Sequence, residues 1–526
     1  MAWPELAVDE PPAPARRRRR SRLLIGLSLL VALFLAAPLA FLALQAVQVG
    51  WSNLSGLLFR HLTATLLWNT VRLAVTVTLL CAVIGTLTAW CIERTDLPAR
   101  SILAVLVVLP VAIPDFIVGY GWVSIAPSVH GYPGAVLVMT LALYPLVYLP
   151  VAASLRGADP AHEEIARSLG WGRLRTFWGV SLRQARTAML GGSLLVALAL
   201  LAEYGAFEIL RFQTFTTEIF TEFQVGFDAP AACALSLVLV ALGLVVLLAE
   251  TGAGRGGVRT SRTGPQVARL ARRVPLGRAR LPTLAGFVAL CGLALGVPIG
   301  TLVYWMIRGG STTLPGTSIL SAALHTAFYS AAAAAVATIL ALPVALAAVR
   351  HRRPTTVLLE RSTYIVQALP GLVIALAFVF FSVRYLPFLY QSPELLILAY
   401  AVLFFPLALV AVRASVARAP SGLEEVGRSL GRRPLSVLWR VTLPLVAPGL
   451  AAAFCLVFLS AVTELTATLI LVPTGVHTLA TQFWAYETNL SYGAAAPYAA
   501  VIVGIAAVPS VVLGRWFDRL PSAVVA

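Results

Sequence analysis

Lysine is absent from the 526-residue sequence, so all 39 basic residues are arginines. A Walker A loop needs a lysine on the β- and γ-phosphates of ATP, and this chain therefore cannot hydrolyse ATP through such a loop. It also lacks an HExxH stretch, and we find no nucleophile elbow or paired-acid motif of an intramembrane enzyme. We therefore expect no catalytic site and no intrinsic cofactor, and any energy for work must come from a partner or an ion gradient.

Charge and cysteine are also scarce. Only 12% of the residues are charged, 59% are hydrophobic and the mean hydropathy is +0.88, which excludes a soluble globular protein. The five cysteines lie in or beside apolar runs without metal-ligand spacing, so we expect no disulfide framework and no zinc site. The formal net charge of +17 would suit nucleic acid, but the arginines gather in alternate loops between apolar runs. We interpret them as a topology signal and expect a lipid bilayer, not nucleic acid, as the partner.

Apolar runs of about 20 residues or more predict twelve transmembrane helices in an all-α, polytopic membrane protein. The runs lie at roughly 23–47, 66–92, 101–125, 134–153, 187–210, 229–249, 283–306, 322–349, 359–383, 394–417, 448–472 and 495–517. The predicted organisation is a disordered basic tail at 1–22, a first six-span half at 23–249, an arginine-rich linker at 250–282 and a second six-span half at 283–526.

The distribution of arginine predicts the orientation. If the N-terminus is cytoplasmic, all but five arginines fall on the cytoplasmic side, and the exceptions are Arg60, Arg72, Arg211, Arg308 and Arg384. Basic residues accumulate in cytoplasmic loops. We therefore expect a multi-pass protein of the cell (inner) membrane with both termini in the cytoplasm.

A polar stretch at 163–183 returns 261 residues later at 424–444. Asp159-Pro160 before the first copy predicts a helix start, and Ser421 with Glu424 in the second copy has the spacing of a capping box, which also predicts a helix start. Gly170 and Gly431 predict the ends of these short helices. Because the first and seventh spans both begin inside, the halves are expected to be parallel six-helix repeats about an axis along the membrane normal, with a translocation path on that axis.

Three predicted spans carry an acid away from their ends, and these acids are Asp115, Glu203 and Glu464. Glu203 and Glu464 are 261 residues apart, whereas Ala375 stands where a partner for Asp115 would be. A carboxylate in lipid costs on the order of 3 kcal/mol, so these groups need a protein-lined or wet location. Two readings stay open for Glu203 and Glu464: hydrogen-bonded structural glutamates, or a carboxylate pair in the translocation path and hence candidate ligands for a hard metal ion such as ferric iron.

Acids also occur in the outer loops. Glu218 and Glu222 would share one face of a helix at i,i+4 spacing, and Glu487 lies in the corresponding stretch of the second half. These three residues are candidates for docking an extracytoplasmic binding protein. Ordinary solvated loop residues are an equally open interpretation.

The duplicated stretch resembles the EAA loop of ATP-binding-cassette (ABC) importer permeases: Glu164-Ile165-Ala166 is followed by Gly170, Val180 and Leu182. The stretches AEYGAFEILRF and TELTATLILVPTGVHTLATQFW are similar to ferric-iron permeases within that family. The resemblance implies the type I importer permease fold, an extracytoplasmic binding protein that delivers Fe(III), and two copies of a separate ATPase that bind the ATP. It also implies ATPase-coupling residues, which are Glu164, Ser168, Leu169, Gly170, Glu425, Ser429, Leu430 and Gly431.

Other functions remain open at this point. Thiamine permeases share the fused layout, and phosphonate or polyamine permeases share the loops. A secondary transporter of the major facilitator type also has twelve spans in two parallel halves, but it needs neither an ATPase nor the duplicated hairpin. A membrane receptor or scaffold would leave the matched spacing of Glu203 and Glu464 unexplained.

Overall fold

The structure is a computed structural model that describes residues 15–49, 51–159, 161–254, 273–309, 316–350, 366 and 369–519. These residues form helices and connecting turns, with one isolated bridge between Thr95 and Val274, which confirms the all-α prediction. Residues 1–14 of the predicted tail and 255–272 of the predicted linker lie outside the described residues. Helix α1 already begins at Ala15, so the end of the predicted tail is helical and not disordered.

The helices of the first half are α1 (Ala15–Val49), α2 (Trp51–Leu58), α3 (His61–Arg94), α4 (Arg100–Val108), η1 (Leu109–Ala112), α5 (Asp115–Ile125), α6 (Gly131–Leu143), α7 (Pro145–Gly157), α8 (Ala161–Ser168), α9 (Arg173–Thr176), η2 (Phe177–Ser181), α10 (Leu182–Ala202), α11 (Gly205–Ile209), α12 (Phe215–Gln224) and α13 (Ala229–Gly254). Those of the second half are η3 (Gly277–Ala279), α14 (Arg280–Cys291), η4 (Gly292–Gly296), α15 (Val297–Arg308), α16 (Gly316–Arg350), α18 (Gly371–Tyr385), η6 (Pro387–Leu389), α19 (Pro393–Leu403), α20 (Phe405–Arg418), α21 (Ser421–Ser429), α22 (Pro434–Val437), η7 (Leu438–Thr442), α23 (Leu443–Val462), α24 (Thr466–Leu471), α25 (Leu479–Thr488) and α26 (Tyr492–Arg519).

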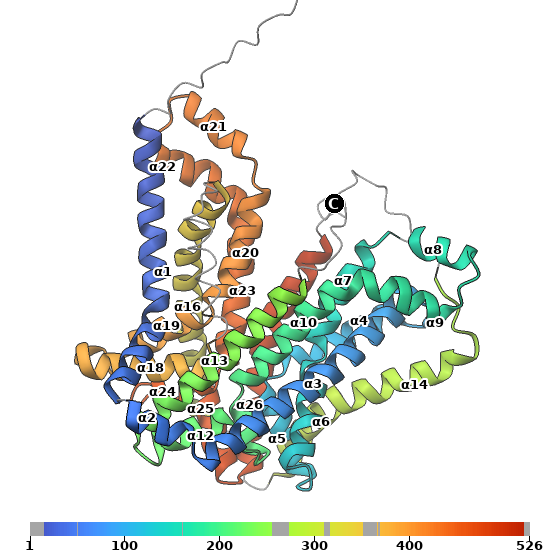
Figure 1. Ribbon diagram of the computed structural model, residues 1–526, viewed down its shortest axis with the longest axis horizontal. Helices are drawn as coiled ribbons and strands as arrows, with labels where there is room; N and C mark the ends of the chain where they lie inside the picture. The colour runs from blue at the N-terminus through green and yellow to red at the C-terminus, as the bar shows by residue number, and fades with distance from the viewer. Residues whose placement is uncertain are drawn as a thin grey trace, which may run out of the picture.

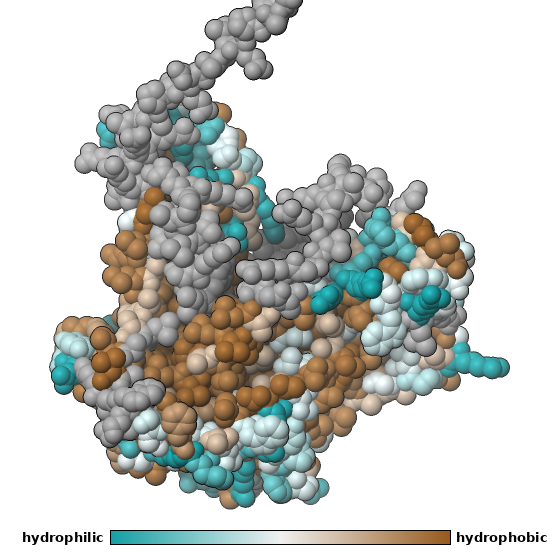
Figure 2. Space-filling view, viewed as in Figure 1, coloured by the Kyte–Doolittle hydropathy of each residue, from teal (hydrophilic) through white to brown (hydrophobic). Residues whose placement is uncertain are grey.

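Apolar helices of membrane-spanning character recur along the described chain. Seven helical segments are long and apolar enough to cross a membrane, two bent helix pairs qualify as broken spans, and three shorter apolar helices overlap the remaining predicted runs. Each of the twelve predicted runs therefore overlaps one of these segments. In the space-filling view, hydrophobic side chains form a broad band over the middle of the molecule with more polar surface at its ends (Figure 2).

The helices form two arms that diverge from a shared base (Figure 1). One arm contains α16, α20 and α23, and the other contains α3, α7 and α10. Helices α12 and α25 lie in the base. The short helices α21 and α8 lie at the far ends of the two arms, on the face that the arginine pattern assigns to the cytoplasm.

The first predicted span of each half packs against helices of the other half. Helix α1 packs on α16 and α18, where the ring of Phe34 lies 6.4 Å from that of Phe378. In return α15 packs on α5, and a Cβ on Gly121 would lie 2.8 Å from the Pro298 Cα atom, so only glycine fits there. The two sequence halves are therefore interlocked and are not separate bundles of six helices.

The fifth and eleventh spans end earlier than the sequence predicts. Helix α10 ends at Ala202 and α23 at Val462, whereas the apolar runs continue to 210 and 472. In both halves the chain then turns into a short helix, α11 or α24, which hydropathy alone does not separate from the span before it. Glu203 and Glu464 lie at these breaks and not inside a continuous helix.

Candidate functional site

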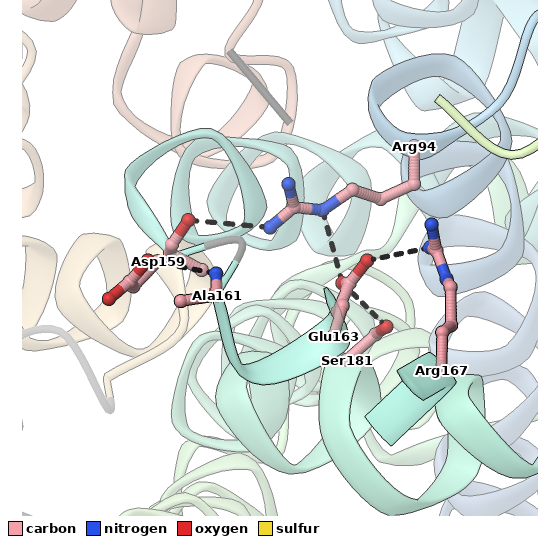
Figure 3. Close-up of polar contacts among 7 residues, drawn as sticks. Arg94, Asp159, Ala161, Glu163, Arg167 and Ser181 are labelled. Carbon is pink, nitrogen blue, oxygen red and sulfur yellow. Dashed lines mark hydrogen bonds and ion pairs between the residues drawn. The ribbon is translucent and has the colours of Figure 1, made fainter. Parts of the chain in front are cut away.

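Helix α8 is anchored to the end of a long transmembrane helix by a buried glutamate (Figure 3). The Glu163 Oε1 atom lies 3.3 Å from Nε of Arg94, the last residue of α3, and both side chains are only 4% exposed. Arg167 Nη2 lies 3.2 Å from Oε2 of the same carboxylate, and the Ser181 hydroxyl donates a hydrogen bond of 2.8 Å to Oε1. Glu163 therefore joins three segments: the end of α3, helix α8, and the chain that leads into α10.

The second half repeats this arrangement. Glu424 of α21 is buried, with Oε1 lying 3.1 Å from Nη2 of Arg350, the last residue of α16, and Oε2 lying 3.0 Å from Nη2 of Arg428. The backbone contact is repeated as well, because Arg350 donates to the Ala419 carbonyl. In the first half Arg94 donates to the matching carbonyl of Ala158. Sequence reasoning missed these roles, although the doubled glutamate in each copy and the arginines at the ends of the second and eighth predicted spans, Arg94 and Arg350, were visible signals.

We call α8 with α9 and α21 with α22 the paired hairpins. The predicted start of the first is confirmed, since Asp159 Oδ1 accepts a hydrogen bond of 2.9 Å from the Ala161 amide. The capping box predicted for the second is wrong: Pro420 is the N-cap residue, and no side-chain cap is formed. The reason is that Glu424 turns inward to two arginines instead of reaching back to the helix start.

Both predicted glycine ends are confirmed. Gly170 has φ +82° and Gly431 has φ +77°, in the left-handed region that glycine adopts readily. The residue after each glycine donates back into its helix, from Trp171 to the Ala166 carbonyl at 3.0 Å and from Arg432 to the Gly427 carbonyl at 3.2 Å. The two turns therefore have the same geometry.

The predicted coupling residues lie on the outer face of these hairpins. Leu169 is 72% exposed and Leu430 is 75% exposed, and both follow a helix whose last turn already presents Ile165 or Val426 to the outside. Glu164, Ser168, Glu425 and Ser429 are exposed as well. Each hairpin thus presents an apolar knob with polar neighbours, while its buried glutamate faces the transmembrane helices.

A π-helical turn follows each hairpin. The turns η2 (Phe177–Ser181) and η7 (Leu438–Thr442) start 261 residues apart and lead into α10 and α23. Single π-helical turns inside helices are uncommon and concentrate at functional positions. The sequence carried no signal that we could use to predict them.

Glu203 and Glu464 cap the short helices that follow the breaks. Glu203 Oε1 accepts a hydrogen bond of 2.7 Å from the Ala206 amide, and Glu464 Oε1 accepts one of 2.9 Å from the Ala467 amide. Glu464 also borders a cavity of about 10 Å³, room for roughly one water molecule. Both glutamates are therefore hydrogen-bonded, as the first of the two interpretations predicts. Both side chains are also only partly buried, which is compatible with a position along a translocation path.

The structure brings the interior acids of the base toward one another. Glu203 lies within electrostatic reach of both Asp115 and Glu464. Asp115 is the first residue of α5 and follows Pro114, just as Gly371 follows Pro370 at the start of α18, so Gly371 and not Ala375 is its structural counterpart. Within the described ranges, no three His, Cys, Asp or Glu side chains are grouped so as to hold a metal ion.

The three acids of the outer loops have different surroundings. The helix predicted for Glu218 and Glu222 is present as α12, but Glu222 Oε1 is paired with Arg60 Nη2 at 2.8 Å. Glu487 in α25 is buried, and burial together with the charge of Glu208 raises its pKa to about 7. Glu218 borders a cavity, where burial and the nearby Glu222 raise its pKa.

Comparison with known proteins identifies relatives across most of the chain. The family described as "Binding-protein-dependent transport system inner membrane component" matches residues 82–251 and 337–523, once in each half. The Fe(3+)-transport system permease protein FbpB 2 of Haemophilus influenzae is 38% identical over 494 residues, which cover 93% of this chain and 97% of that protein. The ferric transport system permease protein FbpB of Actinobacillus pleuropneumoniae is 21% identical over 75% of this chain and 63% of its own length. The sulfate transport system permease protein CysT of Salmonella typhimurium is 29% identical over 42% of this chain and 88% of its own length.

Proposed function

Because the chain belongs to the family of binding-protein-dependent transport system inner membrane components, we propose that it is the permease subunit of an ABC importer that takes up ferric iron. An extracytoplasmic binding protein delivers the iron, and two copies of a separate cytoplasmic ATPase drive alternating access. The paired hairpins and both chain termini lie in the cytoplasm.

The observation that carries this proposal is the duplication of the hairpins. Leu169 and Leu430 present the same apolar side chain to about the same extent. They directly follow α8 and α21, which lie at the ends of two different arms (Figure 1). Two equivalent knobs suit two identical partner grooves, which is what a dimer of one ATPase subunit offers. Exposed apolar surface with a polar rim is typical of such protein contacts.

The buried ion pairs provide a mechanical link from these contacts to the membrane. When the ATPase dimer closes, each hairpin is pushed as a unit, because its turn is fixed by backbone hydrogen bonds around Gly170 or Gly431. The Glu163 contact with Arg94 passes this displacement to α3, and the Glu424 contact with Arg350 passes it to α16. The two arms then rotate relative to each other, a rigid-body change of the kind found in transport proteins.

Iron is the proposed cargo because of the relatives. Two proteins named for ferric transport match both halves of this chain, whereas the match to the sulfate permease covers only 42% of it. Fe(III) is a hard cation that prefers oxygen ligands, and Glu203 and Glu464 are the matched carboxylates near the proposed path. Since no metal cage is present among the described residues, we propose a transient route for iron and not a storage site.

The test is reconstitution of the full chain in vesicles with the ATPase and the iron-loaded binding protein. Uptake of iron is expected only when ATP and both partners are present. Uptake without the ATPase would instead indicate a secondary transporter. Uptake of another cargo but not of iron under the same conditions would support the importer function and exclude iron as the cargo.

The coupling surface is tested in the same system with Leu169→Asp combined with Leu430→Asp. We expect loss of ATPase binding in a pull-down assay, because a carboxylate on each knob must be desolvated in the contact. Leu423→Asp is the matched control: it changes an exposed leucine of α21 whose counterpart in the first hairpin, His162, is not apolar. Equal ATPase binding by the double variant and the control would contradict the assignment of the knobs.

A further inference from the structure

A polar cavity of about 530 Å³ is lined by residues of the first half. Its lining includes residues of α12, which lies in the base, at the end of the molecule opposite the paired hairpins (Figure 1). The cavity is within the size range of small-molecule sites. Its lining comes from α3, α6, α11, the segment after α11 and α12, and consists of Asn69, Arg72, Tyr132, Glu208, Arg211, Phe212, Gln213, Thr217, Glu218 and Thr221. The proposed transport mechanism does not use this cavity.

The cavity contains two positive and two negative side chains that are not joined to one another. In the described part of the chain, none of Arg72, Arg211, Glu208 and Glu218 forms an ion pair within 4 Å. The Arg72 guanidinium is held over the rings of Tyr132 and Phe212, at 4.5 and 5.6 Å from their centroids, and its buried Nε has no hydrogen-bond partner there. Unpaired charges of both signs around one cavity are complementary to a ligand that carries both charges.

The position of Arg72 along α3 places the cavity at the edge of the bilayer. Arg72 and Arg94 are 22 residues apart, about 33 Å along a helix, and residues 73–92 between them carry no charge. This distance matches the hydrocarbon core of a bilayer, about 30 Å thick. Since Arg94 marks the end of α3 that bears the hairpins, Arg72 lies at headgroup level in the opposite leaflet.

The same face of α3 is exposed to lipid. Trp68, Val75 and Leu79 are 64%, 53% and 62% exposed, and with Arg72 they form a stripe at helical spacing. An arginine in such a stripe extends its charged end toward the interface, and tyrosine and tryptophan are enriched at the same level. The cavity is therefore reached from the headgroup region of the membrane.

We propose that this cavity binds the headgroup of a phospholipid that carries a phosphodiester and a primary ammonium group, as in phosphatidylethanolamine. Arg72 and Arg211 bind the phosphate oxygens, and Glu208 and Glu218 accept hydrogen bonds from the ammonium group. Asn69 and Thr221 provide further polar contacts at the cavity wall. A quaternary ammonium, as in phosphatidylcholine, has no N–H to donate and fits less well.

The second half has a corresponding region in which uncharged residues replace three of these charged residues. Thr70 and Thr326 accept the same hydrogen bond, from the first residue of α12 and of α25, so α3 and α16 correspond with an offset of 256 residues. Phe328, which is 61% exposed, therefore takes the place of Arg72. From the offset of Glu203 and Glu464, Leu469 replaces Glu208 and Val472 replaces Arg211. The proposed lipid site is thus present in one half only, and the other half provides a matched control.

Native mass spectrometry of the purified full chain tests the proposal, with titration of phosphatidylethanolamine or phosphatidylcholine into detergent micelles. We expect at least tenfold tighter binding of phosphatidylethanolamine to the wild-type chain. Arg72→Gln and Arg211→Gln should each weaken it about tenfold, whereas Glu218→Gln should mainly reduce the preference for phosphatidylethanolamine over phosphatidylcholine. Phe328→Leu, at the position that corresponds to Arg72, should leave lipid binding unchanged. Because Arg211 is exposed, Arg211→Gln tests the site without disturbing the packing of α3.

Three outcomes would overturn the proposal. The first is equal binding of the two lipids by the wild-type chain, and the second is unchanged phosphatidylethanolamine binding in both arginine variants. The third is binding of glycerophosphoethanolamine, the headgroup without acyl chains, as tightly as the lipid, which would identify a soluble ligand. If the arginine variants bind lipid normally but lose the extracytoplasmic binding protein, the cavity is a protein docking site.

Discussion

Two neighbouring glutamates in each hairpin have opposite surroundings. Glu163 and Glu424 are buried against arginines that end transmembrane helices, whereas Glu164 and Glu425 face outward. A buried ion pair contributes little net stability relative to an apolar pair, but removal of one partner leaves an uncompensated charge. The inner glutamates are therefore sensitive positions even though they are not the ones that a partner contacts.

Replacement of Glu163 by glutamine is expected to destabilise the protein by about 3 kcal/mol, because Arg94 is left buried without its counter-ion. Glu424→Gln should cost less, since Arg350 and Arg428 are 17% and 43% exposed and water can solvate them. Thermal unfolding of the detergent-solubilised protein measures both effects. Glu164→Gln, one residue away on the exposed side, is the control, and an equal loss of stability in that variant would contradict the inward role of Glu163.

Glu203 and Glu464 allow their two roles to be separated. Glutamine retains the oxygen that accepts from the Ala206 or Ala467 amide but removes the charge, whereas alanine removes both. If the carboxylates guide iron, the double glutamine variant should already reduce uptake at least tenfold in reconstituted vesicles, with little loss of stability. If they serve only as caps, uptake should fall in the alanine variants and stay normal in the glutamine variants. The second result would remove both residues from the proposed path.

Each hairpin is a short rigid unit between two transmembrane helices. Its turn depends on a glycine in the left-handed region, and the chain continues through a π-helical turn into α10 or α23. A displaced hairpin therefore acts through the buried glutamate on one side and through the π-helical turn on the other.

Gly170 tests the rigidity of this unit. A Cβ atom there would meet nothing within 4 Å, so alanine fits sterically and its cost of about 1 kcal/mol is conformational. Valine costs more because its branched side chain tolerates positive φ poorly. We expect Gly170→Val with Gly431→Val to insert normally but to uncouple ATP hydrolysis from uptake. Hydrogen exchange of residues 161–176 measures the loosened turn, and Gly172→Ala, also in open space but without positive φ, should leave exchange and coupling unchanged.

The elements that could be predicted from the sequence are those with local or repeated signals. Hydropathy located the twelve apolar segments, and the 261-residue repeat located the hairpins with their glycine ends. The breaks at Glu203 and Glu464 could not be predicted because the apolar run continues past them without a proline or glycine at the last helical residue. The inward orientation of Glu163 depends on Arg94, 69 residues earlier in the chain, which no local pattern specifies.

The exchange of first spans between the halves is the main departure from two simple repeats. Val31, Leu35 and Leu42 of α1 are buried in a cluster that consists largely of second-half residues, and Phe287, Leu295 and Leu302 are buried in the first-half cluster. Lipid is as apolar as these side chains, so close packing and not the hydrophobic effect must favour the exchange. The arms can diverge at the hairpins and still share one base because each is tied to the opposite half at its edge.

This interlocking predicts how the two halves assemble. When the chain is produced as two fragments, 1–262 and 263–526, we expect a tag on either fragment to recover both, because each supplies a span that the other lacks. Phe41→Ala should weaken recovery, since its ring packs against those of Phe381 and Tyr385 at 6.1 and 6.3 Å and truncation of a buried aromatic costs about 3 kcal/mol. Phe388→Ala is the control, because Phe388 is 78% exposed in the same half as Phe381. Fragments that unfold at the same temperature alone as together would mean that each half is complete by itself, which the contacts of α1 and α15 contradict.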